Sequence, residues 1–391
     1  MRILMLAPEE FFSSTGTPFS ILYRARVLSE LGYEIDILTY HLGSDVKIKN
    51  VKIYRIWAPF FIKKIPIGSS ITKIFLDLIL FLKAFSLLLG GKYGRLHVHE
   101  EAAYMGIIFK KVFKIPLIYD MHSSIPEQLS HNRNTLYNNK ILVGLAKYLE
   151  KLALKIADKI IVICPYLLEL ANKTHPSEKY VLIENCLSDV DFSRVTEANQ
   201  SRVRKKLNIP DEYKTIVYIG TLEYYQGIDL LVNSIPLVLE KNPLVKFVIV
   251  GGWEEQIKEF KDLAESLKVA ENIIFTGQRE IEEIPDYLAL ADVLVSPRIK
   301  GTNTPLKIYD YLKSRKPIVA TNLLTHTQVL NQTTAILTEP KPKEFARGII
   351  SVLENPELSA RISEKARKIA DSKYSEREYI IKVNKIYERK I

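Results

Sequence analysis

The polar loop after the apolar run Val293–Val295 combines positive charge with residues that favour the start of a helix. Its cationic side chains are Arg298, Lys300 and Lys307. Thr304 is a good N-cap, and Pro305 is favoured at the first helical position. A helix that starts there presents unpaired N–H groups at the positive end of its dipole, which attracts phosphate. Because Asp310 follows in the helix and can accept hydrogen bonds from sugar hydroxyls, segment 296–321 predicts a site for a nucleotide or a nucleotide-sugar.

A second helix start of the same kind follows the first predicted strand, in the segment Ser13–Pro18. Thr17 and Pro18 repeat the Thr-Pro pattern, and Gly16 before them would let a backbone approach a ligand closely. Taken alone, the segment is better explained as an ordinary strand–helix turn with a good cap. Two such starts, one in each half of the chain, favour a shared cleft with two anion-binding edges.

Polar residues also end the predicted strand that begins with the apolar run Pro116–Ile118. Asp120 and His122 follow this run, so His122 lies just past the carboxyl end of a strand, where sites form in parallel sheets. A lone histidine is more often structural than catalytic, and both interpretations stay open. The sequence has no Cys, His and Asp cluster with metal-ligand spacing, no G-x-S-x-G nucleophile elbow and no Walker loop. We therefore expect no metal and no cofactor.

The composition is that of an ordinary soluble globular protein, with 391 residues, 47% hydrophobic and 26% charged. This length predicts two domains of similar size. Cys164 and Cys186 give no disulfide framework, and the apolar run Ile3–Leu6 is too short for a signal peptide, so we expect a cytoplasmic protein. The net charge of +10 fits either a lysine-rich proteome or attraction to an anionic surface or ligand. Nucleic acid is not an expected partner, because the sequence has no motif for it.

Apolar strand patterns alternate with amphipathic helix patterns along most of the chain. The predicted strands of the first half are 2–7, 35–39, 51–56, 95–99, 116–120, 159–163 and 180–184, with helices at 18–31, 101–113 and 140–156. Polar residues from about 188 to 213 interrupt the pattern. It restarts with strands at 214–219, 245–250, 272–276, 292–296, 317–320 and 333–337, and helices at 228–240, 254–267, 282–290, 305–314 and 342–354. Two such series predict an α/β protein with two doubly wound, Rossmann-like domains that face a cleft. The domains are expected at 1–190 and 191–374, and helix 375–391 is expected to cross back to the first domain.

The segment 74–89 is almost wholly apolar, with Asp77 and Lys83 as its only charged residues. Basic residues flank it at Lys63, Lys64, Lys73, Lys92 and Arg95. A bilayer span needs about 20 apolar residues, so a transmembrane helix is the least favoured of three alternatives. A buried helix and a helix that lies in the membrane surface both stay open, and the basic flanks support the second.

Several further motifs stand at the ends of predicted strands. They are the glycine loop at 13–18, Asp120-Met121-His122, Ile219-Gly220-Thr221-Leu222-Glu223, Phe275-Thr276-Gly277, Ala291-Asp292-Val293 leading to Ser296-Pro297, and Lys307 through Thr321. With these motifs the chain resembles retaining, family-4-type glycosyltransferases of the GT-B fold over nearly its whole length. The motifs are specific together, and none is decisive singly.

This resemblance implies roles for individual residues. Gly16 and Thr17 would approach the donor diphosphate from the first domain, and His122 would lie near the transferred sugar and the acceptor. Gln278 and Arg279 stand in the loop that would hold the nucleobase through its backbone. The residues that would offer N–H groups to the diphosphate and the sugar are Thr302, Asn303, Thr304 and Leu306.

The chain also departs from the family pattern. The family often has two glutamates in an E-x7-E spacing, whereas here Thr302 stands first and Asp310 second, where it would hold the ribose hydroxyls. The family often has an Arg and a Lys in the opening loop of the second domain, and here Thr221 and Gln226 stand in their place. A metal-free transferase must stabilise the negative charge of the leaving group. We infer that the cations of the 296–306 loop and Lys307 replace the missing pair, with Lys307 as the principal one.

Two details stay open from the sequence alone. Arg298 and Lys300 either help to bind the diphosphate or form a solvated basic loop. The segment Glu223–Gln226 contains two tyrosines, which either contact the sugar or pack against the linker between the domains.

The resemblance therefore predicts an enzyme that moves a sugar, with retention, from a nucleoside-diphosphate sugar to a hydroxyl group in glycan, polysaccharide or glycolipid synthesis. It implies a front-face mechanism, in which the leaving phosphate helps to accept the acceptor's proton while Asp120 and His122 orient the reacting groups. A glycan or lipid-linked acceptor would lie against the first domain, with residues 58–95 docking on the inner face of the membrane. Two rivals are a non-catalytic nucleotide-sugar-binding or scaffold protein, motivated by the missing cations, and a nucleotide-sugar epimerase.

Overall fold

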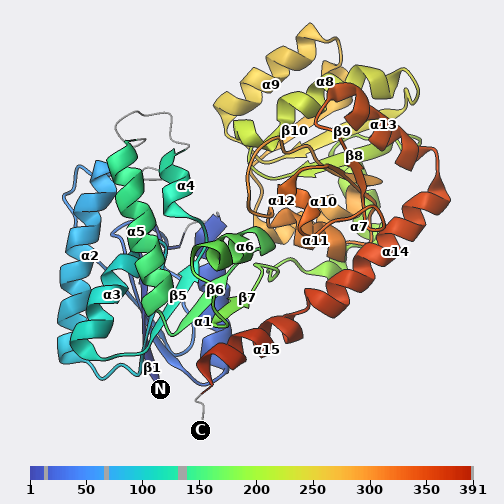
Figure 1. Ribbon diagram of the computed structural model, residues 1–391. Coiled ribbons are helices and arrows are strands. Elements are labelled where there is room, and N and C mark those ends of the chain that lie inside the picture. The colour runs from blue at the N-terminus through green and yellow to red at the C-terminus, as the bar shows by residue number, and fades with distance from the viewer. Residues whose placement is uncertain (13–15, 66–69, 131–138, 389–391) are drawn as a thin grey trace. The chain divides into compact units, whose positions relative to one another are not determined.

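The computed structural model describes residues 1–12, 16–65, 70–130 and 139–388. Its chain divides into two compact units, one formed by Met1–Asn185 with the segment from Tyr379 onward, and one formed by Cys186–Glu378. Each unit contains one parallel sheet with helices on its faces (Figure 1). The predicted fold class of two Rossmann-like α/β domains is therefore confirmed.

The sheet of the first unit has the strand order β3-β2-β1-β4-β5-β6-β7, and all its neighbours are parallel. Its strands are β1 (Arg2–Ala7), β2 (Glu34–Thr39), β3 (Val51–Arg55), β4 (Arg95–His99), β5 (Leu117–Met121), β6 (Lys159–Val162) and β7 (Tyr180–Leu182). The order reverses between β1 and β4. In doubly wound sheets, ligands bind beyond the carboxyl ends of the strands at such a switch point.

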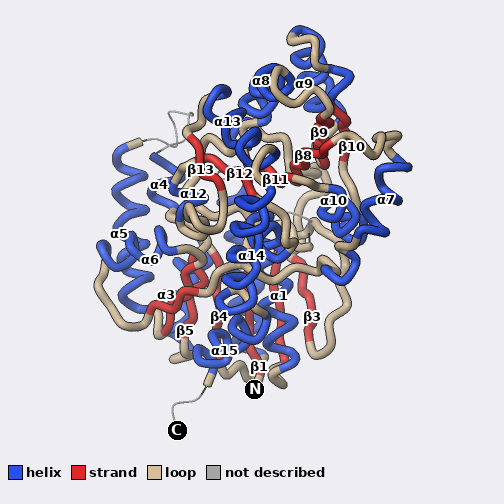
Figure 2. Tube along the Cα trace, turned by 90° about the vertical axis from the view of Figure 1, so that its right-hand side faces the viewer, coloured by secondary structure: helices blue, strands red, loops and turns tan. Residues whose placement is uncertain are grey.

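Helices cover both faces of this sheet: α1 (Gly16–Glu30), α2 (Ile71–Gly90), α3 (Ala102–Phe113), α4 (Ile125–Ser130), α5 (Lys140–Ile156), α6 (Pro165–Thr174) and α15 (Glu376–Tyr387). Side chains alternate between the two faces of the sheet along β4, and the two faces differ in polarity. Leu96 and Val98 belong to the apolar core that α2, α3, α5 and α6 share. His97, on the opposite face, contacts Tyr387 of α15, and Figure 2 shows α15 running past β1 and β4.

Helix α2 has two different apolar faces. Leu76, Leu80 and Ala84 are buried in the core, so the buried-helix alternative accounts for one face. Leu78 and Leu82 on the other face are 58% and 59% exposed, so that alternative does not account for the whole helix. Ser70 starts it by accepting a hydrogen bond from Lys73 N at 3.2 Å.

Among the helices of the described residues, none combines the length and the apolar character that crossing a membrane requires.

The second unit has the strand order β10-β9-β8-β11-β12-β13, again with all neighbours parallel. The strands are β8 (Lys214–Ile219), β9 (Val245–Val250), β10 (Ile273–Gly277), β11 (Val293–Ser296), β12 (Ile318–Thr321) and β13 (Ile336–Thr338). The helices are α7 (Glu197–Lys206), α8 (Ile228–Leu239), α9 (Glu254–Ser266), α10 (Ile284–Leu290), α11 (Lys307–Lys313), α12 (Leu324–Thr327), α13 (Pro342–Leu353) and α14 (Pro356–Lys373). Here the switch point lies between β8 and β11.

The polar stretch that interrupts the sequence pattern contains α7 as an ordered helix. Thr196 caps it by accepting a hydrogen bond from Asn199 N at 3.3 Å. Ala198 and Val203 are its only apolar side chains, so it has almost no hydrophobic periodicity for a pattern analysis to detect.

Candidate active site

The loops after β8 and β11 are joined at the switch point of the second unit. Ile299 N–H donates a hydrogen bond to Tyr225 O at 3.0 Å, which ties one loop to the other. Gly227 has a φ of +70°, and a Cβ on it would lie 2.2 Å from Pro297 O. Only glycine therefore permits this close approach of the two backbones.

Lys307, from the β11 side, reaches across this junction. Its Nζ lies 3.4 Å from Gln226 Oε1 and 3.8 Å from the centroid of the Tyr218 ring. A Cβ added to Gly220 would lie 2.5 Å from the same nitrogen, so the ammonium fills the space beside that glycine. Burial, with a smaller contribution from Arg298, holds the pKa of Lys307 well below its usual value. The Lys307 amine thus lies beside Gln226, the residue that stands where the family often has a lysine.

The two other cations of the loop lie over the tyrosines of the β8 loop. Arg298 lies 5.0 Å from the ring centroid of Tyr225, and Lys300 Nζ lies 5.3 Å from that of Tyr224. Arg298 Nε also donates to Lys300 O at 2.7 Å. Contacts of this kind contribute about 0.5–2 kcal/mol each. The tyrosines therefore contact cations of the neighbouring loop.

The predicted start of helix α11 is wrong. The helix begins at Lys307, with Leu306 as a cap that makes no side-chain hydrogen bond. Thr304 Oγ1 is buried and makes no hydrogen bond to the described residues. The residues before the helix form a tight turn, in which Ile308 N donates to Pro305 O at 3.0 Å. Lys307 is thus the first residue of a seven-residue helix, not the third residue of a longer one. Positive charge at this site comes mainly from side chains and less from the helix dipole.

Side chains of the segment 325–328 hold the turn before α11 by hydrogen bonds to its backbone. Gln328 Nε2 donates to Thr302 O, and Thr325 Oγ1 donates to Asn303 O, each at 2.6 Å. His326 is buried between Ser296 and β12, with Nε2 2.8 Å from Ser296 Oγ. Burial lowers the pKa of His326 to about 3, so the ring is neutral near pH 7 and serves to position the loop.

Asp310 lies one turn into α11, on the same side as Lys307. It is half-buried, bonds to Ser188, and has one buried oxygen, Oδ1, without a hydrogen bond to the described residues. Burial raises the pKa of this carboxyl to about 6. A buried acceptor without a partner is suited to bind a ligand hydroxyl.

The remaining predicted donor residues of this unit also lie in loops at this edge of the sheet. Gln278 and Arg279 are exposed after β10, which is two strands from β8, and Arg279 Nη2 donates to Thr276 O at 2.7 Å. Glu223 is also exposed and accepts a hydrogen bond from Gln256 Nε2 at 3.0 Å. Gln278 and Arg279 thus lie in a loop two strands from β8, whereas Glu223 lies in the same loop as Gln226.

In the first unit, Gly16 is the first residue of α1. It is exposed, with a φ of +49°, and a Cβ on it would meet none of the described residues within 4 Å. Thr17 beside it is half-buried. The other members of this predicted glycine loop, residues 13–15, lie outside the described residues.

Asp120 is the centre of a buried charged group at the end of β5. Its Oδ2 lies 3.3 Å from Arg24 Nη2 and 3.3 Å from His97 Nε2, while its Oδ1 lies 3.2 Å from His122 Nε2. Burial alone would raise the pKa of Asp120, yet Arg24 and His122 hold it well below its usual range. Asp120 is fully buried, and its Oδ1 faces His122 Nε2, so it is placed to orient that ring; its predicted catalytic role stays a prediction.

The hydrogen bonds of this group assign the protons on the imidazoles. Burial lowers the pKa values of His97 and His99, so both rings are neutral. His97 Nε2 faces the carboxylate and carries the hydrogen, which leaves Nδ1 to accept one from the Tyr387 hydroxyl. His99 Nδ1 lies 3.1 Å from His122 Nε2, the nitrogen that also faces Asp120. Tyr387 of α15 is thereby connected through His97 and Asp120 to His122.

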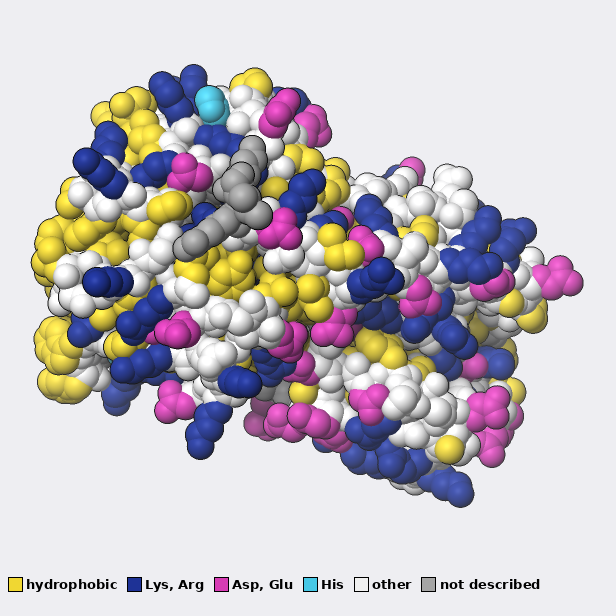
Figure 3. All heavy atoms as spheres, turned by 90° about the horizontal axis from the view of Figure 1, so that it is seen from below, with side chains coloured by type: hydrophobic (Ala, Val, Ile, Leu, Met, Phe, Trp, Pro, Cys, Tyr) yellow, Lys and Arg dark blue, Asp and Glu magenta, His cyan; other side chains and the backbone are white. Residues whose placement is uncertain are grey.

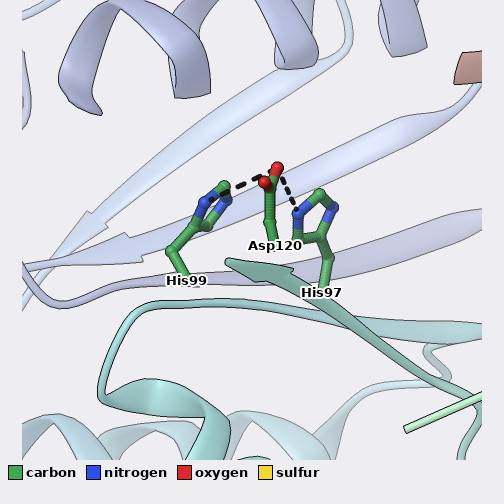
Figure 4. A group of neighbouring side chains, drawn as sticks. All are labelled: His97, His99 and Asp120. Carbon is green, nitrogen blue, oxygen red and sulfur yellow. Dashed lines mark hydrogen bonds and ion pairs between the residues drawn. The ribbon is translucent and has the colours of Figure 1, made fainter. Parts of the chain in front are cut away.

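His97, His99 and Asp120 are also close enough to one another for a metal ion, as Figure 4 shows. Arg24 competes for the same carboxylate oxygen, because its guanidinium lies 3.3 Å from Asp120 Oδ2. A cation there would meet a second positive charge without solvent between them. The donor set therefore suits a hydrogen-bond network better than a metal centre.

Sequence reasoning missed several members of this first-unit group: Arg24, His97, His99, Glu100 and Tyr387. A signal existed for two of them, because His97 and His99 stand on one face of a predicted strand next to the strand of Asp120. Glu100, which follows β4, accepts a hydrogen bond from Ser123 Oγ at 2.7 Å. No local pattern marks Tyr387, which is far from the group in sequence.

Two family models match this chain, and together they span most of it. The description "Glycosyltransferase Family 4" matches residues 15–189, and "Glycosyl transferases group 1" matches residues 199–369. The chain belongs to this family of glycosyltransferases and has the GT-B fold. It is accordingly an enzyme of the glycosyl-transferring class.

Known relatives agree with this assignment at low identity. The chain is 23% identical to alpha-D-kanosaminyltransferase of Streptomyces kanamyceticus, over 72% of this chain and 73% of that protein. It is 24% identical to alpha-monoglucosyldiacylglycerol synthase of Streptococcus pneumoniae, over 82% of this chain and 71% of that protein. Among solved structures, Anabaena HepE in complex with UDP matches with a TM-score of 0.75 at 17% identity, over 98% of each chain.

Proposed function

We propose that this glycosyltransferase uses a nucleoside-diphosphate sugar as donor and that Lys307 binds the donor's diphosphate. The observation that carries the proposal is the position of the Lys307 ammonium beside Gln226, at the switch point of the second sheet. Thr221 and Gln226 leave the β8 loop without the cations that the family often has there. Lys307, from the β11 side, would supply positive charge at the same place once a bound diphosphate keeps its amine protonated, and Arg298 lies near enough to influence its pKa. The UDP complex of the HepE structure supports a nucleotide donor of this kind.

The reaction that we propose is transfer with retention at the anomeric carbon. The bond from that carbon to the diphosphate oxygen breaks, and a bond to the acceptor oxygen forms on the same face. The acceptor's proton goes to the leaving phosphate, so no enzyme nucleophile is needed. Lys307 stabilises the charge that develops on the diphosphate, which is usually a large contribution to catalysis. Asp310 holds the ribose hydroxyls through its buried oxygen. We expect no metal in this mechanism.

In the first unit, His122 would act near the sugar and the acceptor hydroxyl. Asp120 and His99 fix its Nε2, since that nitrogen lies 3.2 Å from the carboxylate and 3.1 Å from His99 Nδ1. The predicted approach of Gly16 and Thr17 to the donor, and of Gln278 and Arg279 to the base, stays a prediction.

The acceptor that we propose is a glycan or a lipid-linked glycan, for polysaccharide or glycolipid synthesis at the cytoplasmic face of a membrane. The lipid synthase among the relatives supports a lipid-linked acceptor. Residues 58–95 would make the peripheral contact, because α2 keeps an exposed apolar face. Nucleic acid has no part in this function.

Family membership favours transfer over both rivals, the non-catalytic binding protein and the epimerase. The direct experiment measures nucleoside-diphosphate release from a panel of UDP-, GDP- and ADP-sugars, with and without lipid and glycan acceptors. Release that depends on the acceptor supports the proposal. Tight donor binding without turnover across the panel would favour the binding protein, and conversion of a donor without acceptor would favour the epimerase.

A further inference from the structure

Helices α2, α3 and α5 of the first unit share an outward surface with many apolar side chains. On α2 and α3 the exposed residues include Ile74, Phe75, Leu78, Leu82, Ile108 and Val112. On α5 they include Ile141, which is 78% exposed, and Leu142, Leu145 and Tyr148. Figure 3 shows apolar side chains gathered with lysines on the side of the molecule that carries these helices. Exposed apolar patches of this extent usually mark an interaction site.

The charges on this surface have one sign. The exposed charged side chains of the three helices are all lysines: Lys83, Lys111, Lys140, Lys147, Lys151 and Lys155. The acidic side chains of the same helices are turned inward. Asp77 accepts a hydrogen bond from Tyr40 at 2.6 Å, and Glu150 is 4% exposed and bonded to Ser124. We call these exposed apolar side chains and lysines the basic apolar surface.

The basic apolar surface continues into the loop between β3 and α2. Trp57, Phe60 and Phe61 are all exposed there, and Phe60 is 91% exposed. This loop follows the carboxyl end of β3. The first turns of α2 and α5 lie at the same edge of the sheet, because the helices run back against parallel strands. His122 follows β5 at that edge as well.

We propose that the basic apolar surface docks on an anionic lipid bilayer, with the 57–61 loop and the first turns of α2 and α5 inserted among the headgroups. Apolar side chains ringed by lysines, without exposed acids, are the composition that binds such interfaces. A second copy of this chain fits less well, since two such surfaces would bring lysines against lysines. The proposal extends the contact through 58–95 to α3 and α5. It rests on the proposed function for its purpose, which is to present a lipid-linked acceptor at the edge that carries His122.

The test is co-sedimentation of the full chain with vesicles of phosphatidylcholine alone or with 30% phosphatidylglycerol. We expect binding to the anionic vesicles only, weakened by salt. Leu78→Gln with Leu82→Gln should lower the partition by at least about tenfold. Lys147→Glu with Lys151→Glu should do the same, because each lysine near the surface contributes about fivefold. Leu244→Gln with Ile381→Gln is the matched control, since both side chains are exposed elsewhere.

The outcomes separate this inference from the proposed function. Loss of vesicle binding in the helix variants, with donor affinity and thermal stability kept, supports the surface. If the wild-type protein does not bind anionic vesicles but turns over donor with a soluble acceptor, the docking proposal is overturned and the proposed function stands. Self-association that the Leu78 and Leu82 changes abolish would overturn it in favour of a second copy. Vesicle binding without any turnover would support the docking proposal and contradict the proposed function.

Discussion

Lys307 Nζ lies 3.4 Å from Gln226 Oε1, across the switch point of the second sheet. The contact joins the first residue of α11 to the loop after β8, two segments that are 81 residues apart. The Gln226 amide oxygen accepts a hydrogen bond from Lys307, and Gln226 stands where the family often has a second cation. Two ammonium groups at this separation would repel each other, so one cation in this place excludes the other.

The low pKa of Lys307 predicts how donor binding depends on pH. In the free protein, burial favours the neutral amine, whereas a bound diphosphate favours the ammonium. Donor affinity should therefore be highest below the pKa of Lys307 in the free protein and fall as pH rises through it, with uptake of a proton on binding above that pKa. Lys307→Arg stays charged, so its affinity should lack this decline. Calorimetry in buffers of different ionisation enthalpy measures the proton. Equal pH dependence in both proteins would contradict the assignment.

Tyr387 should affect turnover without affecting donor binding. Tyr387→Phe leaves the buried His97 Nδ1 without its donor, which costs about 1–3 kcal/mol of unfolding free energy. We expect a lower kcat and a shifted pH profile of kcat, because the chain to Asp120 and His122 loses its fixed proton arrangement. Tyr33→Phe is the matched control, since the Tyr33 hydroxyl donates to the backbone oxygen of Tyr387 at 3.2 Å and does not bond to His97. An unchanged pH profile in Tyr387→Phe would reduce Tyr387 to a purely structural role.

Chelation should leave the enzyme active. In the proposed mechanism, Lys307 and Arg298 would supply the positive charge for the diphosphate, and Arg24 competes for the carboxylate that a metal would need. Turnover measured with EDTA is therefore expected to equal turnover without it. Loss of activity with EDTA and recovery with Mg²⁺ or Mn²⁺ would show that the cationic side chains alone do not stabilise the charge of the leaving diphosphate.

Gly227 should be intolerant of a side chain. A Cβ there would meet Pro297 O at 2.2 Å, and the φ of +70° adds about 1–2 kcal/mol of strain. We expect Gly227→Ala to destabilise the protein by more than Gly16→Ala, whose φ is also positive but whose Cβ would meet none of the described residues within 4 Å. Thermal unfolding of both variants gives the comparison. Similar losses would mean that the two loops can separate at little cost.

Most of the fold could be predicted because the central strands, such as β1 and β5, are buried on both faces and consist mainly of apolar residues. The strand at 214–219 and the helix at 140–156 agree with the structure at both ends. Helix α7 was missed because its stability depends on capping and charge, not on an apolar stripe. The start of α11 was placed too early because Thr304 and Pro305 form a turn before the helix.

The candidate site could be predicted only where a motif stands at the end of a strand. Asp120, His122 and Asp310 were found in this way. The contact of Lys307 with Gln226 depends on which strands are neighbours in the sheet, and the connection of Tyr387 to His97 depends on the path of the last helix. Such long-range relations leave no periodicity in the sequence.

The most direct test of the central claim is the affinity of the best-bound nucleotide among UDP, GDP and ADP for wild-type protein and Lys307→Ala, measured by calorimetry. Charge-assisted phosphate contacts contribute about 1.5–3 kcal/mol, so the variant should bind about 10–150-fold more weakly. Adding Gln226→Lys to Lys307→Ala should recover part of the loss, because it returns a cation to the β8 loop. Nucleotide affinity that is unchanged in Lys307→Ala would contradict the account.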